Sequence, residues 1–548
     1  MKITINGKEY ILKEPTKIID LINNEKRDIL ACIVDNRLKD LNYMPDDGSK
    51  VELVDLSTPD GMWVYQSTLR YIICMAIKNI YKNAKVKISY SVSRTLYAGI
   101  SNLDHPYTMK DFNNIKNEIE RIISADYPIK LTPISKKDAI KLYEELGYQD
   151  KIDVLVHRKK NTLHIYKCQN YANNLYEFLM PSTGYVRNYK LTFYGQGFNI
   201  SYPRYELDEK LPKFQEEATF REVLRESNIW SNIVHADSIP ELRNIIENNK
   251  FLDLINLCET RHNRELSHLA DKIVGNIEKI KLICVAGPSS SGKTTFTSKL
   301  KIELQSRGYE PFMISMDNFY KTKNYPKDKN GNDDYEHIKA LDLNLFDKVI
   351  YNLITGNEVR LPKFIFGIRK REYTAPVKLK ENQPILIEGI HGLNPLIAPS
   401  IMPENKFNIF ISPITTIRID DHSPISSTDL RLIRRMVRDA ATRKTNPDDT
   451  LKQWKSVRNG EFKWIFPYQD NADFVFNSTL LYELCITSKI VLPLLQEVKR
   501  ESPNYNLARR IAKMINYFPQ VSDEWVPCNS LLREFIGGSI FYPDDKRK

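Results

Sequence analysis

The sequence predicts a multidomain protein in which a β-grasp unit, an α+β domain and a helical connector precede an α/β domain built on a parallel sheet. The chain has 548 residues, and domains usually have about 100–200 residues each. Its first residues alternate apolar and polar side chains around an Asn-Gly turn, the pattern of a β-hairpin. Far downstream, a short apolar run precedes a glycine-containing loop and an apolar-periodic helix, as expected of a buried parallel strand and its following helix.

The composition excludes several classes of protein. Hydrophobic residues make up 42% and charged residues 27% of the chain, which is the balance of a globular rather than a disordered protein. No apolar run approaches the roughly 18 residues that span a bilayer, and the charged start MKITINGKEY lacks the apolar stretch of a signal peptide. The seven cysteines are scattered without a CxxC pair, which excludes a disulfide scaffold and a zinc ribbon. We therefore expect a cytoplasmic protein with no membrane partner.

The net charge is mildly positive. The chain has 80 Lys+Arg against 69 Asp+Glu, a formal charge of +11, and most of the surplus lies in residues 59–205. A solvated basic surface explains this surplus, and so does an RNA or nucleotide-phosphate partner. The charge alone does not separate the two.

Residues 1–58 are expected to form the β-grasp domain. Thr16 is expected to cap its short helix, and no catalytic group is apparent, so we interpret the domain as a binding or packing module. The expected elements are strands Lys2–Ile5 and Tyr10–Leu12, a helix over Lys17–Asn23, and strands Ala31–Asp35 and Lys50–Val54.

Residues 59–205 are expected to form an α+β domain, and residues 206–277 a helical connector. In the first, helices are predicted at Ser67–Tyr81 and Lys110–Ile123, and strands at Lys85–Val92, Ile152–His157 and Thr162–Tyr166. In the connector, helical spacing recurs in Phe220–Ile229, Ile239–Phe251 and Leu266–Ile277. His262 and His268 lie six positions apart in the connector and do not share a helical face, so a metal pair is not expected.

A β-grasp unit followed by a helix ending AIKNIYKNAK resembles the TGS domain and second additional domain of threonyl-tRNA synthetases. That family carries a His-x-x-x-His and a later Cys-x-x-x-His that line an editing site. Aligned by AIKNIY, these positions fall on Ser67, Tyr71, Leu179 and Thr183. The resemblance therefore implies that the metal ligands and the editing chemistry have been lost.

The run KLICVAGPSSSGKTT carries the clearest chemical signal. Leu282–Ala286 has the composition of a buried parallel strand, and the residues after it match G-x-x-x-x-G-K-[ST] in a strand–loop–helix context. Glycines let the backbone wrap a phosphate, and the amides at the helix N-terminus supply positive potential. Lys293 is expected to reach the β- and γ-phosphates and Thr294 to ligate Mg²⁺. The predicted ATP-binding residues are Gly287, Pro288, Ser289, Ser290, Ser291, Gly292, Lys293, Thr294 and Thr295.

Two acidic residues follow further predicted strands. Asp317 comes after Pro311–Ser315, and Glu388 comes after Pro384–Ile387. Ligands bind outside the carboxyl ends of such strands, where Asp317 could accept a proton from an attacking hydroxyl and help hold Mg²⁺, and Glu388 could ligate the metal. The alternatives are a helix N-cap for Asp317 and a solvated loop for Glu388.

A predicted helix, Asp429–Lys444, is rich in arginine. Its guanidinium groups would repel one another unless anions lie among them, so we interpret the helix as a mobile arginine lid that clamps a transferring phosphoryl group. Solvated charges paired with Asp429 and Asp439 are the alternative. The arginines are Arg431, Arg434, Arg435, Arg438 and Arg443.

The motifs GPSSSGKTT, SMDNFY, DYEHIKALD, PILIEGI and RLIRRMVRD occur in the order seen in uridine kinases and the wider phosphoribulokinase/uridine kinase family. The resemblance covers about 280–490, within an expected kinase domain at 278–500. With the synthetase-like front half and the ending NSLLREFIGGSIFY in a C-terminal extension (501–548), the chain resembles multidomain uridine kinase-like nucleoside kinases. The implied reaction is ATP-dependent phosphorylation of a nucleoside 5′-hydroxyl.

The resemblance also assigns roles to individual residues. Asp317 matches the base that accepts the 5′-hydroxyl proton, and Arg438 and Arg443 match lid arginines on the phosphates. Residues expected to bind the nucleoside are Tyr320, Glu336 and Arg435.

The base-reading stretch departs from the family pattern. The family has Tyr-x-Phe-x-x-His, and the corresponding residues are Phe364, Phe366 and Arg369, while a further lid arginine falls on Thr445. These departures do not affect the residues expected for phosphoryl transfer, and they leave the identity of the base open.

The sequence thus predicts a Mg²⁺- and ATP-dependent nucleoside kinase with uridine or cytidine as leading acceptors. One alternative is another acceptor, either a purine nucleoside or a sugar phosphate that uses Arg369 as an anion clamp. Another is an RNA- or ribosome-associated P-loop regulator that binds RNA through residues 1–205. The oligomeric state is left open.

Overall fold

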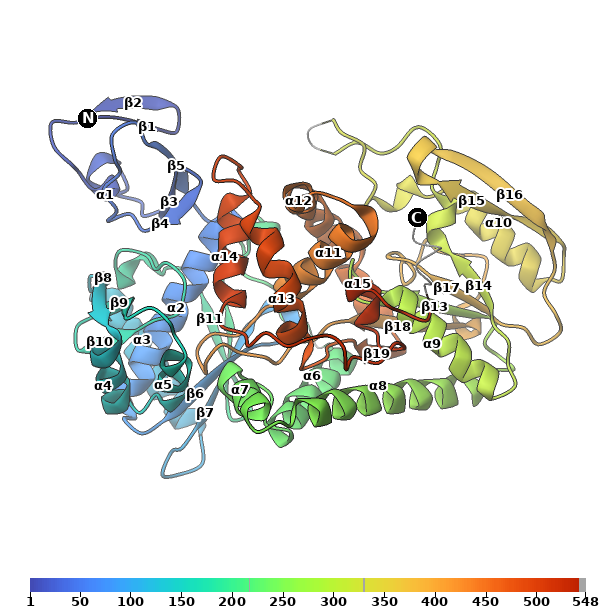
Figure 1. Ribbon diagram of the computed structural model, residues 1–548, viewed down its shortest axis with the longest axis horizontal. Coiled ribbons are helices and arrows are strands. Elements are labelled where there is room, and N and C mark those ends of the chain that lie inside the picture. The colour runs from blue at the N-terminus through green and yellow to red at the C-terminus, as the bar shows by residue number, and fades with distance from the viewer. Residues whose placement is uncertain (216, 329–330, 542–548) are drawn as a thin grey trace.

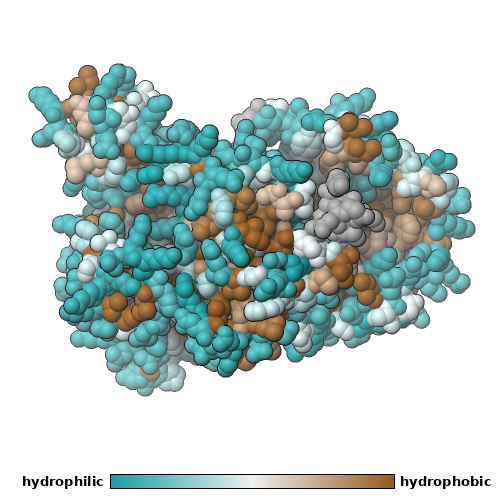
Figure 2. Space-filling model, viewed as in Figure 1, coloured by the Kyte–Doolittle hydropathy of each residue, from teal (hydrophilic) through white to brown (hydrophobic). Residues whose placement is uncertain are grey.

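A computed structural model describes residues 1–215, 217–328 and 331–541. In Figure 1 the N-terminal unit lies at the upper left, a second α+β unit below it, and a parallel-sheet domain at the right. No helix within these ranges is both long and apolar enough to cross a membrane. Figure 2 shows a mainly hydrophilic face on which apolar side chains gather in limited areas.

The N-terminal sheet has the mixed topology of a β-grasp. Its strand order is β2-β1-β5-β3-β4, with β1 and β5 parallel. The elements are β1 (Lys2–Ile5), β2 (Lys8–Ile11), α1 (Ile18–Leu21), β3 (Ala31–Val34), β4 (Arg37–Lys39) and β5 (Lys50–Val54). The predicted cap at Thr16 is wrong: Lys17 is the N-cap residue and has no side-chain cap bond, while the Thr16 hydroxyl donates to the Glu14 carbonyl at 2.9 Å.

The second unit packs helices on two antiparallel sheets, ordered β11-β12-β7-β6 and β10-β9-β8. Its first helix, α2 (Pro59–Ile80), begins well before the predicted Ser67, because the Thr58 hydroxyl accepts from the Gly61 amide at 3.1 Å and proline suits the first turn. The other elements are β6 (Lys85–Tyr90), β7 (Leu96–Ser101), α3 (Met109–Ser124), β8 (Lys130–Ser135), α4 (Lys136–Leu146), α5 (Gln149–Val156), β9 (Thr162–Cys168), β10 (Tyr171–Asn173), β11 (Lys190–Tyr194) and β12 (Gly197–Ser201).

Helix α5 occupies the place of the predicted strand Ile152–His157, so that prediction is wrong. Ile152 and Leu155 are three positions apart and both are buried, which places them on one helical face. A short apolar run is compatible with either a strand or a buried helix, and here tertiary packing favours the helix.

The connector is helical as expected and contains α6 (Ala218–Ile233), α7 (Ile239–Glu247) and α8 (Phe251–Val274). Helix α7 ends before the predicted Phe251, and α8 begins well before the predicted Leu266. Helix α8 is one long helix along the lower edge of Figure 1. Its buried residues Leu254, Cys258 and Leu269 share a hydrophobic core with Val285 and Phe296 of the parallel-sheet domain. The segment is therefore packed into that domain and is not a free linker.

The third unit contains a five-stranded sheet, ordered β14-β17-β13-β18-β19, in which neighbouring strands are parallel. Its strands are β13 (Leu282–Ala286), β14 (Phe312–Ser315), β17 (Ile385–Glu388), β18 (Lys406–Ser412) and β19 (Phe474–Asn477). Chain order reverses at β13, so a crevice is expected at the carboxyl ends of β13 and its neighbours.

Helices and a hairpin surround this crevice. They are α9 (Lys293–Ser306), α10 (Leu343–Ile354), β15 (Val359–Ile365), β16 (Lys370–Val377), α11 (Ser427–Arg443), α12 (Pro447–Trp464) and α13 (Glu483–Gln496). The C-terminal extension adds α14 (Tyr505–Ile515) and α15 (Arg533–Ile536). Leu532 and Phe535 of the extension are fully buried in the domain core, and residues 542–548 of that predicted segment lie outside the described residues.

The loop between β18 and α11 joins the second and third units. Asp420 forms a buried ion pair with Lys151 of α5 at 2.7 Å, and the His422 carbonyl accepts from Arg70 of α2 at 2.9 Å. The His422 imidazole also lies 3.1 Å from the Asn173 amide nitrogen. Charged and polar groups this deeply buried require partners, so the contact holds the two units in one arrangement.

Candidate phosphoryl-transfer site

The loop 287–292 connects the central strand β13 to helix α9, and both glycines of its motif are required by geometry. A Cβ on Gly287 would lie 2.0 Å from the Ile411 carbonyl oxygen. Gly292 has φ +92°, a conformation that side chains disfavour. The loop therefore curls tightly beneath the first turn of α9.

The loop fits a phosphate chain. The buried hydroxyls of Ser290, Ser291 and Thr295 have no hydrogen-bond partner among the described residues, although buried polar groups normally have one. The Lys293 ammonium donates to the carbonyls of Gly287 at 3.0 Å and Pro288 at 3.2 Å. A bound phosphate would satisfy the hydroxyls and give Lys293 a charged partner.

Burial lowers the pKa of Lys293, and the carboxylates of Glu388, Glu534 and Asp317 oppose this shift. The negative charges of these acids therefore favour the charged form of the ammonium group. Thr294, the predicted metal ligand of the loop, is exposed beside them.

Asp317 and Glu388 are brought together because β14 and β17 are adjacent. Glu388 ends β17 and pairs in register with Ser315 of β14, whose hydroxyl donates to the Glu388 carboxylate at 2.8 Å. Asp317 follows in the turn after β14. Surrounding protein raises the pKa of Asp317, while Lys293 and Arg443 lower it.

Burial and then the Asp317 charge raise the pKa of Glu388 to about 7. A cation bound beside the two carboxylates would offset the effect of the Asp317 charge on Glu388. Asp317, Glu388 and Thr294 therefore offer the oxygen ligands that Mg²⁺ prefers.

Two arginines of α11 are paired with carboxylates of the protein, which corrects the prediction that the whole arginine set clamps a phosphoryl group. Their guanidinium groups also donate to P-loop carbonyls, Arg431 to Ser289 at 3.1 Å and Arg434 to Ser291 at 3.5 Å. Arg431 forms a double hydrogen bond with Glu461 of α12, and Arg434 does so with Glu483 of α13 at 2.7 and 2.9 Å. All four side chains are buried. Carboxylates of the protein itself thus balance the positive charges of these two arginines.

The other three arginines, Arg435, Arg438 and Arg443, share Asp439 at 3.3, 2.9 and 3.3 Å. Arg435 also donates to the Ser289 hydroxyl of the P-loop at 3.0 Å. This places it at the loop, and Arg443 is close enough to Asp317 to lower its pKa. Both positions are compatible with phosphate contacts.

Asp429, the other acid considered as a partner, instead pairs with Arg510 of α14 at 2.7 and 2.9 Å. Arg510 in turn lies over the Trp63 ring of α2 at 4.8 Å. The beginning of α11 is therefore held by the C-terminal extension and by the second unit.

Tyr320, three residues after Asp317, packs with Phe364 and Phe366 in a cluster that we call the aromatic wall. The Tyr320 ring centroid lies 5.9 Å from that of Phe364 and 5.5 Å from that of Phe366, and the two phenylalanines are 4.9 Å apart. The Tyr320 hydroxyl donates to the Tyr335 carbonyl at 3.1 Å. Phe366 is 58% exposed and can pack on a flat ring.

Glu336 and Arg369 flank this wall. Burial and Glu461 raise the pKa of Glu336 to about 7, and Arg435 lowers it. Arg369 donates to Asp333 at 3.1 Å and lies over the Tyr325 and Tyr335 rings at 5.8 and 5.5 Å. Its guanidinium is thus already paired, and its contact with a base stays a prediction.

Three residues that sequence reasoning missed also belong here. Gln453 of α12 accepts from Arg435 at 3.0 Å, Glu461 orients Arg431, and Glu534 of α15 accepts from the Thr295 amide at 3.0 Å. Glu534 lies 239 positions from Thr295 along the chain. No local pattern could have indicated this contact.

Gly460 of α12 allows Glu336 its position. A Cβ at residue 460 would lie 2.3 Å from the Glu336 Cβ and 3.0 Å from its Cγ. Alanine favours helices over glycine by about 1 kcal/mol, so the helix should survive Gly460→Ala while Glu336 is displaced. We expect the KM of the acceptor to rise about tenfold or more, with nucleotide affinity unchanged.

Steady-state kinetics against both substrates would measure this effect. Gly275→Ala is the matched control, because a Cβ there meets only ordinary contacts, the nearest at 3.4 Å, far from the site. An unchanged acceptor KM in Gly460→Ala would contradict a role for Glu336 in acceptor binding.

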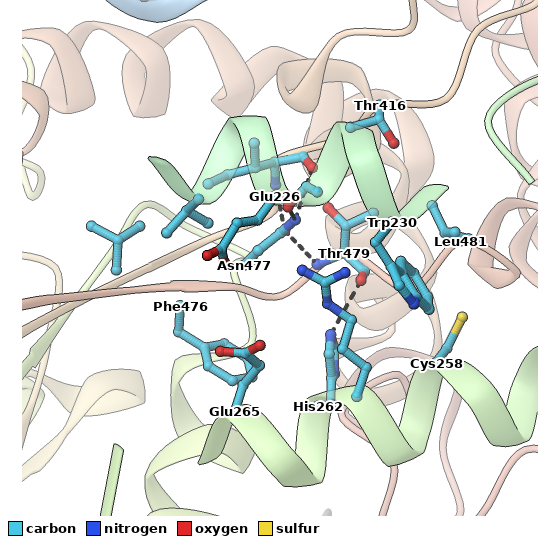
Figure 3. Close-up of a pocket in the computed structure, with 15 residues that line it drawn as sticks. Glu226, Trp230, Cys258, His262, Glu265, Thr416, Phe476, Asn477, Thr479 and Leu481 are labelled. Atoms are coloured by element: carbon cyan, nitrogen blue, oxygen red, sulfur yellow. Dashed lines mark hydrogen bonds between the residues drawn. The ribbon is translucent and has the colours of Figure 1, made fainter. Parts of the chain in front are cut away.

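A small cavity of about 40 Å³ lies between α6, α8 and the end of β19 (Figure 3). His262 lines it and its ring nitrogen lies 3.1 Å from the Thr479 carbonyl, and burial lowers the pKa of this imidazole to about 3. The cavity has room for water but not for a nucleoside.

The four positions of the synthetase editing pattern serve packing and hydrogen bonding. The Ser67 hydroxyl donates to Glu177, and the Tyr71 hydroxyl lies 3.1 Å from the carbonyls of Tyr166 and Tyr171. Leu179 is buried, and Thr183 donates to the Ile122 carbonyl at 2.8 Å.

The parallel sheet, the P-loop after its central strand and the carboxylates at the neighbouring strand ends define a P-loop kinase domain. Residues 282–481 match the model of the Phosphoribulokinase / Uridine kinase family. The C-terminal half of the chain thus contains a kinase domain of this family.

The N-terminal region resembles part of threonine–tRNA ligases. The Syntrophotalea carbinolica enzyme is 26% identical over 167 residues, which is 30% of this chain and 26% of the ligase. The Aquifex aeolicus enzyme is 25% identical over 198 residues, 35% and 31% of the two chains. The chain thus spans only about a quarter to a third of the length of these relatives.

Among solved structures, one described as "a Possible Uridine Kinase from Bacillus stearothermophilus" is 18% identical. It covers 40% of this chain and 100% of its own, with a TM-score of 0.27.

Proposed function

We propose that the protein phosphorylates the 5′-hydroxyl of a nucleoside with ATP, uridine and cytidine being the leading acceptors. The observation that supports the proposal is that Asp317, three residues before Tyr320 of the aromatic wall, lies close enough to Lys293 of the P-loop for the lysine charge to lower the pKa of the carboxyl group. In the proposal, a phosphate donor on the P-loop, a base for the acceptor hydroxyl and an aromatic surface for a flat ring are neighbours.

In the proposed mechanism the P-loop amides and Lys293 hold the donor phosphates. Asp317 accepts the proton of the acceptor hydroxyl as it attacks the terminal phosphorus, and the bond to the β-phosphate oxygen breaks. Arg438 and Arg443 balance the charge that spreads over the transferring group. Mg²⁺, held by Thr294, Glu388 and Asp317, would neutralise part of the phosphate charge.

On the acceptor side, we assign Tyr320, Phe364 and Phe366 to the base and Glu336 to the sugar hydroxyls. Arg435 would position the acceptor near the P-loop. Arg369 is paired with Asp333 at the surface, and such exposed pairs are weak. A sugar phosphate that binds Arg369 therefore stays the alternative acceptor.

The test is ADP production with Mg·ATP against ribonucleosides, deoxyribonucleosides and sugar phosphates, with the products identified by mass spectrometry. We expect a rate that depends on a pyrimidine nucleoside and yields its 5′-monophosphate. A rate with purine nucleosides or sugar phosphates alone would replace the acceptor but keep the reaction. Hydrolysis without any acceptor, or stimulation only by RNA, would replace the proposal with the regulator function.

A further inference from the structure

A loop from the C-terminal extension lies on the P-loop. Residues 528–540, here called the strap, form a closed loop in which the Ile540 amide donates to the Cys528 carbonyl at 3.1 Å. The strap contains α15 and reaches Gly292 so closely that a Cβ there would lie 2.5 Å from Leu531 Cδ2. It is therefore part of the wall of the donor site.

One side chain of the strap makes a polar contact with the phosphate-binding amides. The Glu534 carboxylate accepts from the Thr295 amide of α9 at 3.0 Å. Its charge also opposes the pKa decrease of Lys293 and contributes to the raised pKa of Glu388. The carboxylate thus lies near the charged groups of the P-loop. Its oxygen accepts the hydrogen bond of an amide that a phosphate oxygen would otherwise use.

The strap backbone is held firmly. The Ser530 hydroxyl donates to Glu259 at 2.6 Å, and the Tyr482 hydroxyl donates to the same carboxylate at 2.6 Å. The Phe535 ring, fully buried, lies 5.1 Å from the Arg434 guanidinium. Because these contacts fix the strap on both sides of residue 534, rotation of the Glu534 side chain is the simplest movement that frees the Thr295 amide.

We propose that Glu534 is a donor-site residue that mimics a phosphate: its carboxylate occupies the Thr295 amide and must rotate away before a donor phosphate can bind there. The proposal rests on the nucleotide-binding part of the proposed function and not on the identity of the acceptor. Two anions cannot share one amide in a water-poor site, so donor affinity falls by the fraction of molecules in which the amide is free. Glu534 thereby sets the donor concentration at which the enzyme works.

The test is the Kd of a non-hydrolysable ATP analogue with Mg²⁺, measured by calorimetry on the full chain. Glu534→Ala should bind it about tenfold more tightly than the wild type. Glu534→Gln keeps an acceptor oxygen but no charge, so it should fall between the two. Glu524→Gln is the matched control, since Glu524 lies exposed on the same extension, and its Kd should equal that of the wild type.

Unchanged or weaker binding by the Glu534 variants would overturn the proposal and make Glu534 a structural or donor-supporting residue. Should Glu534→Ala fail to fold, the isosteric Glu534→Gln decides alone. The readout is independent of acceptor turnover. If no nucleoside is phosphorylated but the Kd order holds, the acceptor assignment fails and the strap proposal stands.

Discussion

Asp317→Asn is expected to reduce phosphoryl transfer by about 10²–10⁴-fold, the usual contribution of a general base. The amide cannot accept the hydroxyl proton, yet it has the shape of the carboxylate and leaves the P-loop intact. Affinity for a nucleotide analogue should therefore change much less than kcat. Transfer rates with saturating ATP, together with calorimetric Kd values, would measure both quantities.

The matched control is Asp253→Asn, which removes an exposed carboxylate from the first turn of α8, outside the site. It should leave transfer and binding unchanged. Full activity of Asp317→Asn would eliminate the proposed base. A loss of nucleotide binding equal to the loss of transfer would instead assign Asp317 mainly to the metal or the donor.

The buried pair of Arg434 and Glu483 should have the largest effect on stability. Both side chains are 0% exposed, and replacing one partner leaves an unpaired charge in the core. Glu483→Gln or Arg434→Met should therefore lower the free energy of unfolding by about 3–5 kcal/mol. The denaturation midpoint in urea, followed by fluorescence and circular dichroism, would measure the loss.

The double variant Arg434→Met/Glu483→Leu removes both charges and should recover much of the stability, because apolar residues can replace a buried pair. Arg225→Ala, which breaks an exposed pair with Glu222 on α6, should leave the midpoint unchanged. If the single variants unfolded at the wild-type midpoint, the pair would not be a structural element of α11.

The synthetase-like front half of the chain contacts the loop that precedes α11. The loop before α11 is buried against α2 and α5 through Asp420 and His422, and Asp429 is held by Arg510. In this arrangement the synthetase-like unit supports the arginine helix of the kinase domain. The positions that correspond to the editing site are used for internal packing and hydrogen bonds.

Some predictions succeeded because their signal is local. The strand and helix around the P-loop pattern form as predicted, because the pattern lies within one contiguous segment. The phosphate and metal roles of Lys293 and Thr294 stay predictions. Asp317 and Glu388 could be placed together because parallel strands align their carboxyl ends. The β-grasp strands followed from alternation and a turn signal.

Other features were predicted wrongly or not at all, because they depend on residues far away along the chain. The apolar run at 152–157 forms a helix once its buried side chains meet neighbouring elements. Arg431 and Arg434 have the spacing of a phosphate clamp, yet the carboxylates of Glu461 and Glu483 lie 30 and 49 positions away. Nothing near those arginines indicates the pairing.

The sequence by itself indicated the class of this protein through short contiguous motifs: a P-loop, acidic residues that follow two parallel strands, and a synthetase-like front half. Only the tertiary structure decided which carboxylate each arginine of α11 pairs with, how the front half holds α11, and that Glu534 accepts the hydrogen bond of the Thr295 amide. The physical reason is that a motif specifies backbone shape and chemistry over a few residues. The electrostatic environment of a buried charged group depends instead on side chains from distant parts of the sequence, which folding brings next to it.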